Sequence, residues 1–310
     1  MPRGIVVALA GATATGKTAV GERVAARLGG AVVCADARQV YRELEIGTGK
    51  PTPAERAERP HRLFDWLDLS ERATAGRWAR EAAAVCERLL EDGVTPVLVG
   101  GSGLYLAALE RGLHPEPPAD AGLRARLEAA WSAEGPEAMH ARLASLDPGA
   151  AASLRVRDRQ RVLRALEIVT AGGRPLSWWR ERPRAAPLAA EWRVFQLVCP
   201  PEVLGERIAA RTRAMWEQGL LEETRGIVTA GKEGALRRLA AIGYDEALAV
   251  LAGTLTRDAA IERTAQRTRQ LAKRQRTWFR HQLASEPIDA ARIDDELDAI
   301  AERVASRAAA

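Results

Sequence analysis

An apolar run from Ile5 to Ala10 leads directly into the glycine-rich segment GATATGKT. This is the phosphate-loop spacing G-x-x-x-x-G-K-[ST], placed between a predicted buried strand and a predicted helix. Backbone N–H groups of such a loop point at one spot, Lys17 adds a positive charge, and the Thr18 hydroxyl can hold Mg²⁺. We therefore expect a diphosphate to bind at Gly11, Ala12, Thr13, Ala14, Thr15, Gly16, Lys17 and Thr18. The motif leaves open whether that diphosphate belongs to a nucleotide.

The first third of the chain continues this alternation of strand and helix. Apolar strands are predicted at Ala31–Ala35 and Thr95–Val99, and helices at Lys17–Leu28 and Ala75–Glu91. Repeated β-α units with continuously apolar strands indicate a parallel sheet covered by helices on both faces. The expected fold class is α/β, with a P-loop NTPase-like sheet. Its functional site should lie at the carboxyl ends of the strands.

The middle of the chain has a different pattern. Between proline-rich segments at 114–118 and 183–187, the sequence has helical periodicity and no strand candidate, and Trp192–Pro200 then returns to a strand pattern. We expect an all-helical insertion domain at 115–191 within a discontinuous core of residues 1–114 and 192–310. The last helices of that core are predicted at Asp258–Leu283 and 294–307.

The helix predicted at Asp258–Leu283 has the most unusual charge pattern. From Thr264 to His281 it holds six basic residues and no acidic one, in a chain of net charge +5. Basic side chains form two stripes and an apolar stripe runs beside them. The first basic stripe holds Arg269, Lys273, Arg276 and Arg280, and the second holds Arg263, Arg267 and Arg274. A single-sign helix favours a polyanion along it, and the alternative is a solvated face of an arginine-rich protein.

Polar residues follow the predicted strands at the edge where the site should lie. Asp36 comes just after the second strand, and it is either a general base, a magnesium partner through water, or a helix-capping residue. Ser102, after the third strand, supplies a hydroxyl to the site or caps a helix. Lys50 lies in a glycine-flexible turn, where it either reaches the phosphates or stays solvated.

Two helices add further cations. Arg211 follows Arg207 by one helical turn, and together with Lys17 it could neutralise a departing diphosphate or remain solvated. In the insertion, Gln160, Arg161 and Arg164 fall within one turn and could contact nucleic acid or the domain junction.

Seven segments together resemble one family, the tRNA dimethylallyltransferases, also called IPP transferases. They run in the family's order from Ile5 to Arg280, and they are GATATGKT, ADARQVYRELEIGTGKPTPAE, PHRLFD, LVGGSGLYLAAL, DRQRVLRALEI, IGYDEAL and RQLAKRQRTWFR. The resemblance implies transfer of a dimethylallyl group from dimethylallyl diphosphate to N6 of the adenosine just 3′ of the anticodon. The acceptors are tRNAs that read codons beginning with U, and Mg²⁺ is the implied cofactor.

The resemblance also assigns roles to residues. Asp36 is the expected general base, Lys17 and Arg211 stabilise the leaving diphosphate, Ser102 completes the catalytic set, and Thr18 holds the metal. The implied tRNA contacts are Asp36, Ala37, Arg38, Gln39, Ser102, Arg124, Gln160, Arg161, Val162, Leu163, Arg164, Lys273, Arg274, Gln275, Arg276, Thr277, Trp278, Phe279 and Arg280. Departures from the pattern weaken contacts at Ala37, which lacks a hydroxyl, and at Ala240 and Asp245, where some relatives have basic residues.

Other readings of the residues stay open at this stage. A P-loop small-molecule kinase would use ATP at the same loop, but it does not explain the acid-free helix. An RNA-binding protein with a vestigial loop leaves Lys17, Thr18 and Asp36 unexplained, and a prenyltransferase acting on free adenine nucleotides does not need a polyanion surface. The chain has no signal-peptide pattern and no long apolar run, so we expect a cytoplasmic protein without membrane contact. A single deep channel for one bulky RNA favours a monomer.

Overall fold

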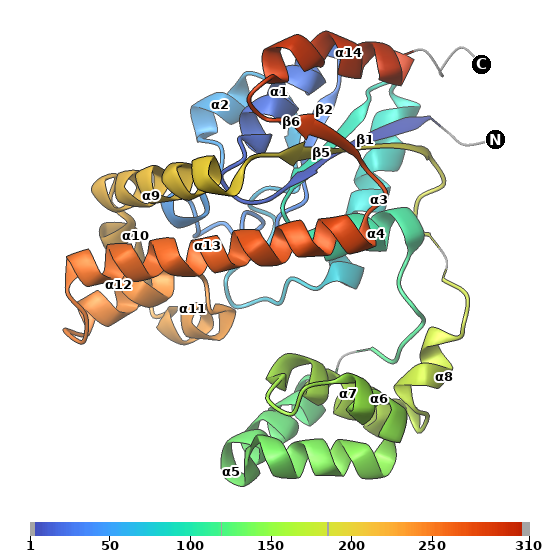
Figure 1. Cartoon of the computed structure of the whole chain (residues 1–310), viewed down its shortest axis with the longest axis vertical. Helices are drawn as coiled ribbons and strands as arrows, with labels where there is room; N and C mark the ends of the chain where they lie inside the picture. Colours follow the sequence, from blue (N-terminus) through green and yellow to red (C-terminus); the bar gives the residue numbers. More distant parts are fainter. Residues whose placement is uncertain (1–3, 119, 185, 306–310) are drawn as a thin grey trace. The chain divides into compact units, whose positions relative to one another are not determined.

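The computed structural model describes residues 4–118, 120–184 and 186–305. Both ends of the expected core and Arg307 of the last predicted helix lie outside the described residues. Within them, one six-stranded sheet has the order β3-β2-β4-β1-β5-β6, and every neighbouring pair of strands is parallel (Figure 1). The strands are β1 (Ile5–Gly11), β2 (Ala31–Cys34), β3 (His61–Arg62), β4 (Pro96–Gly100), β5 (Glu191–Val198) and β6 (Glu286–Asp289). The predicted α/β fold class is confirmed.

The two outer strands were not expected from the sequence. β3 has only two residues, and in β6 only Ile288 is buried, so neither gives a recognisable apolar run. Both are assigned to the sheet by their neighbours: β3 pairs with β2, and β6 pairs with β5. These outer strands therefore form because they pair with a neighbouring strand, and their own residues give no strand pattern.

Both faces of the sheet are covered, as the continuously apolar strands predict. Val7 and Leu9 of β1 point to one face, where helices α1 (Lys17–Arg27) and α14 (Ile293–Ala305) complete a buried cluster. Val6 and Ala8 point to the other face. Its covering helices include α3 (Ala75–Glu91) and α4 (Gly103–Arg111), and Figure 1 shows α1 beside α14.

The remaining helices of the core follow β5, except for one short helix and one turn. The turn η1 (Ile46–Thr48) and α2 (Pro53–Ala57) lie between β2 and β3. After β5 come α9 (Pro201–Glu217), α10 (Leu220–Thr229), α11 (Glu233–Leu239), α12 (Tyr244–Leu251) and α13 (Arg257–Gln282). The chain turns between α9 and α10 at Gly219, whose φ of 105° is left-handed. No described helix is both long and apolar enough to cross a bilayer.

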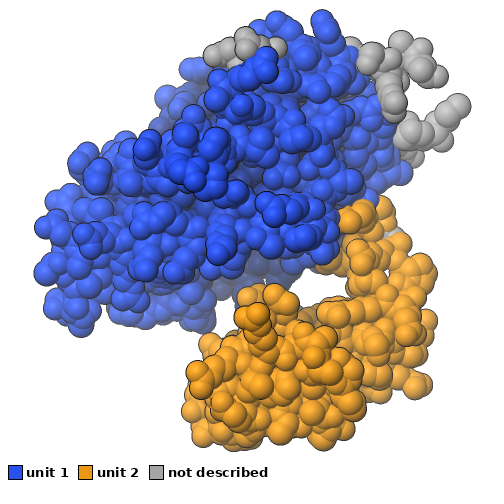
Figure 2. Space-filling model, viewed as in Figure 1, with its two compact units in different colours: residues 1–110, 187–310 blue, residues 111–186 orange. Residues whose placement is uncertain are grey.

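The chain divides into two compact units, coloured separately in Figure 2. One unit holds the sheet and runs to Glu110 and again from Pro187; the other is Arg111–Ala186. The expected domain boundaries were 114/115 and 191/192. The second unit consists of α5 (Ala121–Leu146), α6 (Pro148–Ser153), α7 (Arg159–Gly172) and α8 (Leu176–Arg180).

A buried aspartate organises this helical unit. The Asp147 carboxylate accepts hydrogen bonds from the N–H groups of Ala150, at 2.9 Å, and of Leu176, at 2.6 Å. It thereby caps α6 and ties the start of α8 to the end of α5. The unit has its own apolar core, to which α5 contributes Leu127 and Leu143.

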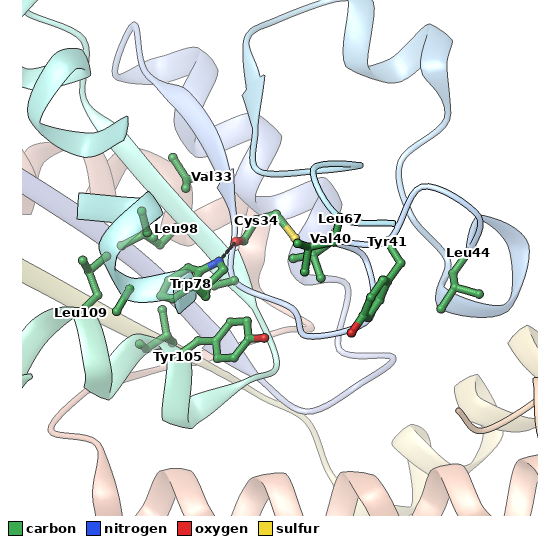
Figure 3. Packing of buried hydrophobic residues seen from close by; sticks show 14 of the residues in the cluster. Val33, Cys34, Val40, Tyr41, Leu44, Leu67, Trp78, Leu98, Tyr105 and Leu109 are labelled. Carbon is green, nitrogen blue, oxygen red and sulfur yellow. Dashed lines mark hydrogen bonds between the residues drawn. The ribbon is translucent and has the colours of Figure 1, made fainter. Parts of the chain in front are cut away.

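The core beneath β2 is centred on Trp78 (Figure 3). Its indole is fully buried, stacks on the Tyr105 ring at a centroid distance of 4.7 Å, and donates a 2.9 Å hydrogen bond to the Cys34 carbonyl. Cys34 is the last residue of β2, so this contact fixes the strand end from which the chain continues to Asp36.

The Trp78→Phe substitution tests that contact. It removes the indole donor while leaving an aromatic ring, and loss of one partner of a buried hydrogen bond costs about 1–3 kcal/mol. We expect a lower urea midpoint of unfolding, measured by circular dichroism. Trp178→Phe in the helical unit is the matched control, since its ring is only half-buried. An unchanged midpoint for Trp78→Phe would show that the indole hydrogen bond does not stabilise this part of the core.

Candidate active site

The loop after β1 has the backbone shape of a phosphate cradle. Gly16, the N-cap residue of α1, has a left-handed φ of 89°, and Ala14 also has a positive φ, of 65°. A Cβ on Gly16 would meet no atom within 4 Å, so this side of the loop is open. The Thr15 hydroxyl donates to the Ala12 carbonyl at 2.9 Å, which closes the turn from within. The loop N–H groups and the start of α1 thus face an open space that an anion can enter.

Lys17 lies folded across this loop. Its ammonium group donates a 2.7 Å hydrogen bond to the Ala12 carbonyl. Burial lowers the pKa of Lys17 to about 8, while the Asp36 carboxylate raises it and the Arg211 guanidinium lowers it further. A positive charge that is costly to hold in the free protein is stabilised when a diphosphate arrives.

Asp36 lies at the same edge of the sheet, just beyond β2. One of its oxygens, Oδ1, accepts the Arg38 N–H at 2.8 Å, which holds the carboxylate in a tight turn. Its other oxygen has no hydrogen-bond partner among the described residues. The Asp36 carboxylate interacts electrostatically with both Lys17 and Arg211, so the three side chains belong to one site.

Ser102 joins the ends of β2 and β4. Its hydroxyl oxygen accepts the Ala37 N–H at 2.9 Å, and its own N–H donates to the Ala35 carbonyl at 3.2 Å. The close approach requires glycine before it, since a Cβ on Gly100 would lie 1.9 Å from the Ala35 oxygen. Ser102 therefore fixes the turn that carries Asp36, and its hydroxyl proton stays available to a ligand.

Arg211 reaches the site from α9. Its guanidinium donates to the Thr48 carbonyl at 3.0 Å, and Gln39 donates to the carbonyls of Thr48 and Gly49 at 3.2 and 3.1 Å. Burial lowers the pKa of Arg211 and the Asp36 carboxylate opposes that shift. A Cβ on Gly49 would lie 2.1 Å from Arg211 Nη2, so a larger residue there would require the guanidinium to shift.

Lys50 does not act as either sequence hypothesis supposed. Its ammonium group is fully buried, donates to the Tyr41 carbonyl at 2.7 Å, and pairs with the carboxylates of Asp65 and Glu45. Arg56 pairs with the same two carboxylates. Lys50 is therefore neither a phosphate ligand nor a solvated lysine. A buried ammonium group needs hydrogen-bond acceptors and opposite charge, and these neighbours supply both.

Helix α13 divides its predicted residues between surface and interior. Lys273, Arg274, Thr277 and Arg280 are exposed, as is Arg269, and Arg276 and Trp278 are half-buried. No described residue forms an ion pair with Arg269, Lys273, Arg274, Arg276 or Arg280. Phe279 is buried in the core, so its predicted tRNA contact is corrected: its side chain is not available.

Neighbouring elements engage other residues that the sequence singled out on α13. The second basic stripe is partly neutralised, since Arg267 pairs with Asp245 and Glu246 of α12 at 2.9 and 2.6 Å. Arg263 also lies 3.6 Å from the Glu246 carboxylate. Gln275 is half-buried, and its side-chain amide forms hydrogen bonds with the loop after β1 and with Gly101 after β4.

In the helical unit the predicted tRNA contacts also divide into exposed and buried residues. Gln160 and Arg161 are exposed on α7, whereas Val162 and Leu163 are fully buried in the core of the unit, so their side chains cannot reach RNA. Arg161 also pairs with Asp158 at 3.1 Å, and the other two arginines are less exposed and form ion pairs as well. Arg124 pairs with Glu128 and Glu167, and Arg164 pairs with Glu116 and Glu167.

Sequence reasoning missed Glu223. From α10 its carboxylate accepts the Ile46 N–H at 2.8 Å and the Tyr244 hydroxyl, and so holds η1 in place beside Arg211. Burial raises the pKa of Tyr244, and the Glu223 carboxylate adds to that shift. Because 177 residues separate Glu223 from Ile46, no local signal could have revealed the contact.

The fold and the loop define an α/β protein of the P-loop class. A family model described as IPP transferase matches residues 39–282. The chain belongs to the IPP transferase family, which confirms the resemblance found in the sequence.

Relatives of known name cover nearly the whole chain. The tRNA dimethylallyltransferase of Geobacter sulfurreducens is 43% identical over 89% of this chain and 88% of its own, and that of Rhodospirillum centenum is 44% identical over 90% of each. The crystal structure of the tRNA isopentenylpyrophosphate transferase of Bacillus halodurans has a TM-score of 0.70 at 33% identity and covers 98% of this chain and 97% of that one. A eukaryotic dimethylallyltransferase acting on tRNA has a TM-score of 0.76 at 27% identity, covering 98% and 77%.

The lowered pKa of Lys17 predicts how activity changes with pH. Below its pKa of about 8 the ammonium group is charged and attracts a diphosphate, and above it that charge is lost. We expect kcat/KM for the diphosphate substrate to fall as pH rises through about 8. Lys17→Arg, which stays charged throughout, should be slower but should lose this alkaline fall. A flat profile for the unaltered protein from about pH 7 to 9.5 would contradict the assignment.

Proposed function

We propose that the protein transfers a dimethylallyl group from dimethylallyl diphosphate to N6 of adenosine 37, just 3′ of the anticodon, in tRNAs that read codons beginning with U. The product is N6-isopentenyladenosine. The observation that carries this proposal is the grouping of Lys17, Arg211 and the half-free Asp36 carboxylate at one sheet edge. Membership of the IPP transferase family supports it.

The adenine amine is a poor nucleophile, because its lone pair is delocalised into the ring. As N6 attacks the allylic carbon, the bond between that carbon and the diphosphate oxygen breaks and its electron pair leaves with the diphosphate. The proton lost from N6 needs an acceptor. Asp36 fits this role, since its Oδ1 is used by the Arg38 N–H and its other oxygen is free of described partners.

The leaving diphosphate needs positive charge and hydrogen-bond donors. Lys17, Arg211 and the loop N–H groups supply both. Thr18 is half-buried at the start of α1, where its hydroxyl would hold an Mg²⁺ that binds with the diphosphate. Among the described residues no group of three or more His, Cys, Asp or Glu side chains could hold a metal ion, which favours this shared site. When bound, the metal neutralises charge on the diphosphate.

The tRNA contacts we propose follow from exposure. The unpaired cations of α13 attract the phosphates, and in the helical unit Gln160 and Arg161 present polar groups. The residues near Asp36 are Ala37, Arg38, Gln39 and Ser102. The target base must be extruded from the tRNA and reach Asp36 to react. One chain supplies every group that this reaction needs, so we expect the monomer to be active.

The direct test is incubation with unmodified tRNA, Mg²⁺ and dimethylallyl diphosphate, followed by nucleoside mass analysis. We expect adenosine to gain one isoprene unit, and Asp36→Asn to lower the rate about 10²–10⁴-fold with tRNA affinity unchanged. Asparagine keeps an oxygen that can accept the Arg38 N–H, so the turn should survive. ATP turnover without modified adenosine would instead indicate a P-loop kinase, and strong loss of tRNA binding by Asp36→Asn would contradict its role as base.

The basic helix gives a separate prediction. Replacing Arg269, Lys273 and Arg276 by Ala should weaken tRNA binding and make the plot of log K against log salt shallower by up to about 2 to 3. Arg267→Ala is the matched control, because this arginine is already paired with Asp245 and Glu246 and should leave the slope unchanged. Filter binding at several salt concentrations measures both. An unaltered slope in the triple variant would show that the basic residues of α13 are an ordinary solvated surface and do not contact tRNA phosphates.

A further inference from the structure

Helix α13 presents different residues to its two sides. Lys273, Arg274 and Thr277 are exposed, while Ala272 is buried and Gln275 is half-buried. The spacing of three residues between Ala272 and Gln275 places them on one face of the helix. The same helix packs against β1 and α9, the two elements that lead to Lys17 and carry Arg211. α13 therefore has a cationic outer side and an inner side in contact with the diphosphate site.

Gln275 uses both ends of its side-chain amide on that inner side. Its Oε1 accepts the Thr13 N–H of the phosphate loop at 2.8 Å, and its Nε2 donates to the Gly101 carbonyl at 2.9 Å. The donor and acceptor partners fix the orientation of the amide, since an N–H must face an oxygen. One side chain thus ties the loop after β1 to the turn after β4, which carries Ser102.

Close packing accompanies these hydrogen bonds. Ala12 of the loop is almost fully buried and belongs to one small apolar cluster with Ala272. A Cβ on Gly101 would lie 2.4 Å from Gln275 Nε2, and one on Gly103 would lie 2.1 Å from the Trp278 ring. The glycines of this turn therefore leave room for α13, and a displacement of the helix must disturb the loop.

We infer that Gln275 is a positioning residue that couples tRNA binding on α13 to diphosphate binding in the Gly11–Thr18 loop. The inference rests on the proposed function. When tRNA phosphates engage the exposed cations of α13, the helix and the amide of Gln275 are held in place, and the Thr13 peptide with them. A loop already ordered in this way binds the diphosphate at a lower entropic cost. By linkage the diphosphate must tighten tRNA binding by the same factor.

The test measures binding without turnover, using tRNA with guanosine in place of the target adenosine. Calorimetry gives the Kd of dimethylallyl diphosphate with Mg²⁺, in the presence and absence of this tRNA. We expect the tRNA to tighten it at least about fivefold in the unaltered protein. Gln275→Met keeps the side-chain length but loses both hydrogen bonds, so this ratio should fall to about one while tRNA affinity alone stays within about twofold. Gln266→Met, an exposed glutamine on the same helix, is the matched control and should keep the full ratio.

A second variant guards against a purely structural effect. In Gln275→Glu a protonated carboxyl can still accept from Thr13 and donate to Gly101, whereas the carboxylate has no proton to donate. The coupling ratio of this variant, relative to the unaltered protein at the same pH, should therefore rise as pH falls. A ratio that is independent of pH, or full coupling in Gln275→Met, would overturn the inference. Absence of any tRNA binding by the unaltered protein would instead refute the proposed function on which it rests.

Discussion

Two cations and one carboxylate share a partly buried space at the carboxyl edge of the sheet, and the proposed function depends on this excess of positive charge. Asp36 interacts with both Lys17 and Arg211 but supplies one negative charge against two positive ones. Burial makes such an excess costly, which lowers the pKa of both cations. A diphosphate removes that cost when it binds. The parallel sheet makes the arrangement possible, because β1, β2 and β4 all end at this edge.

Three contacts elsewhere in the core fix the segments that meet at this edge of the sheet. Trp78 secures the end of β2, Ser102 joins the turns after β2 and β4, and Glu223 holds η1 beside Arg211. Each contact joins segments that are distant in the chain and ends on a backbone group. The turns that carry the proposed catalytic side chains are thus held by hydrogen bonds from other segments, and one Asp36 oxygen has no hydrogen-bond partner among the described residues.

Some site residues could be predicted from the sequence and others could not. The phosphate loop, Asp36 and the basic helix could be located from the sequence, because each is a pattern of residues within one short segment. Lys50 could not be interpreted correctly, since its role depends on Asp65 and Glu45, which fold around it. Val162, Leu163 and Phe279 were carried over with their motifs as tRNA contacts although apolar residues of amphipathic helices pack inward.

The sequence by itself determined the α/β class, the diphosphate loop and the family, because apolar periodicity, glycine spacing and motif order are properties of short segments. Tertiary structure alone decided which charges are free. Arg267 and Arg269 are two residues apart on the same basic helix, yet α12 neutralises the first and leaves the second exposed. It also decided that Gln275 faces the phosphate loop. The physical reason is that ion pairs and buried hydrogen bonds depend on distance in space, which the order of residues along the chain does not record.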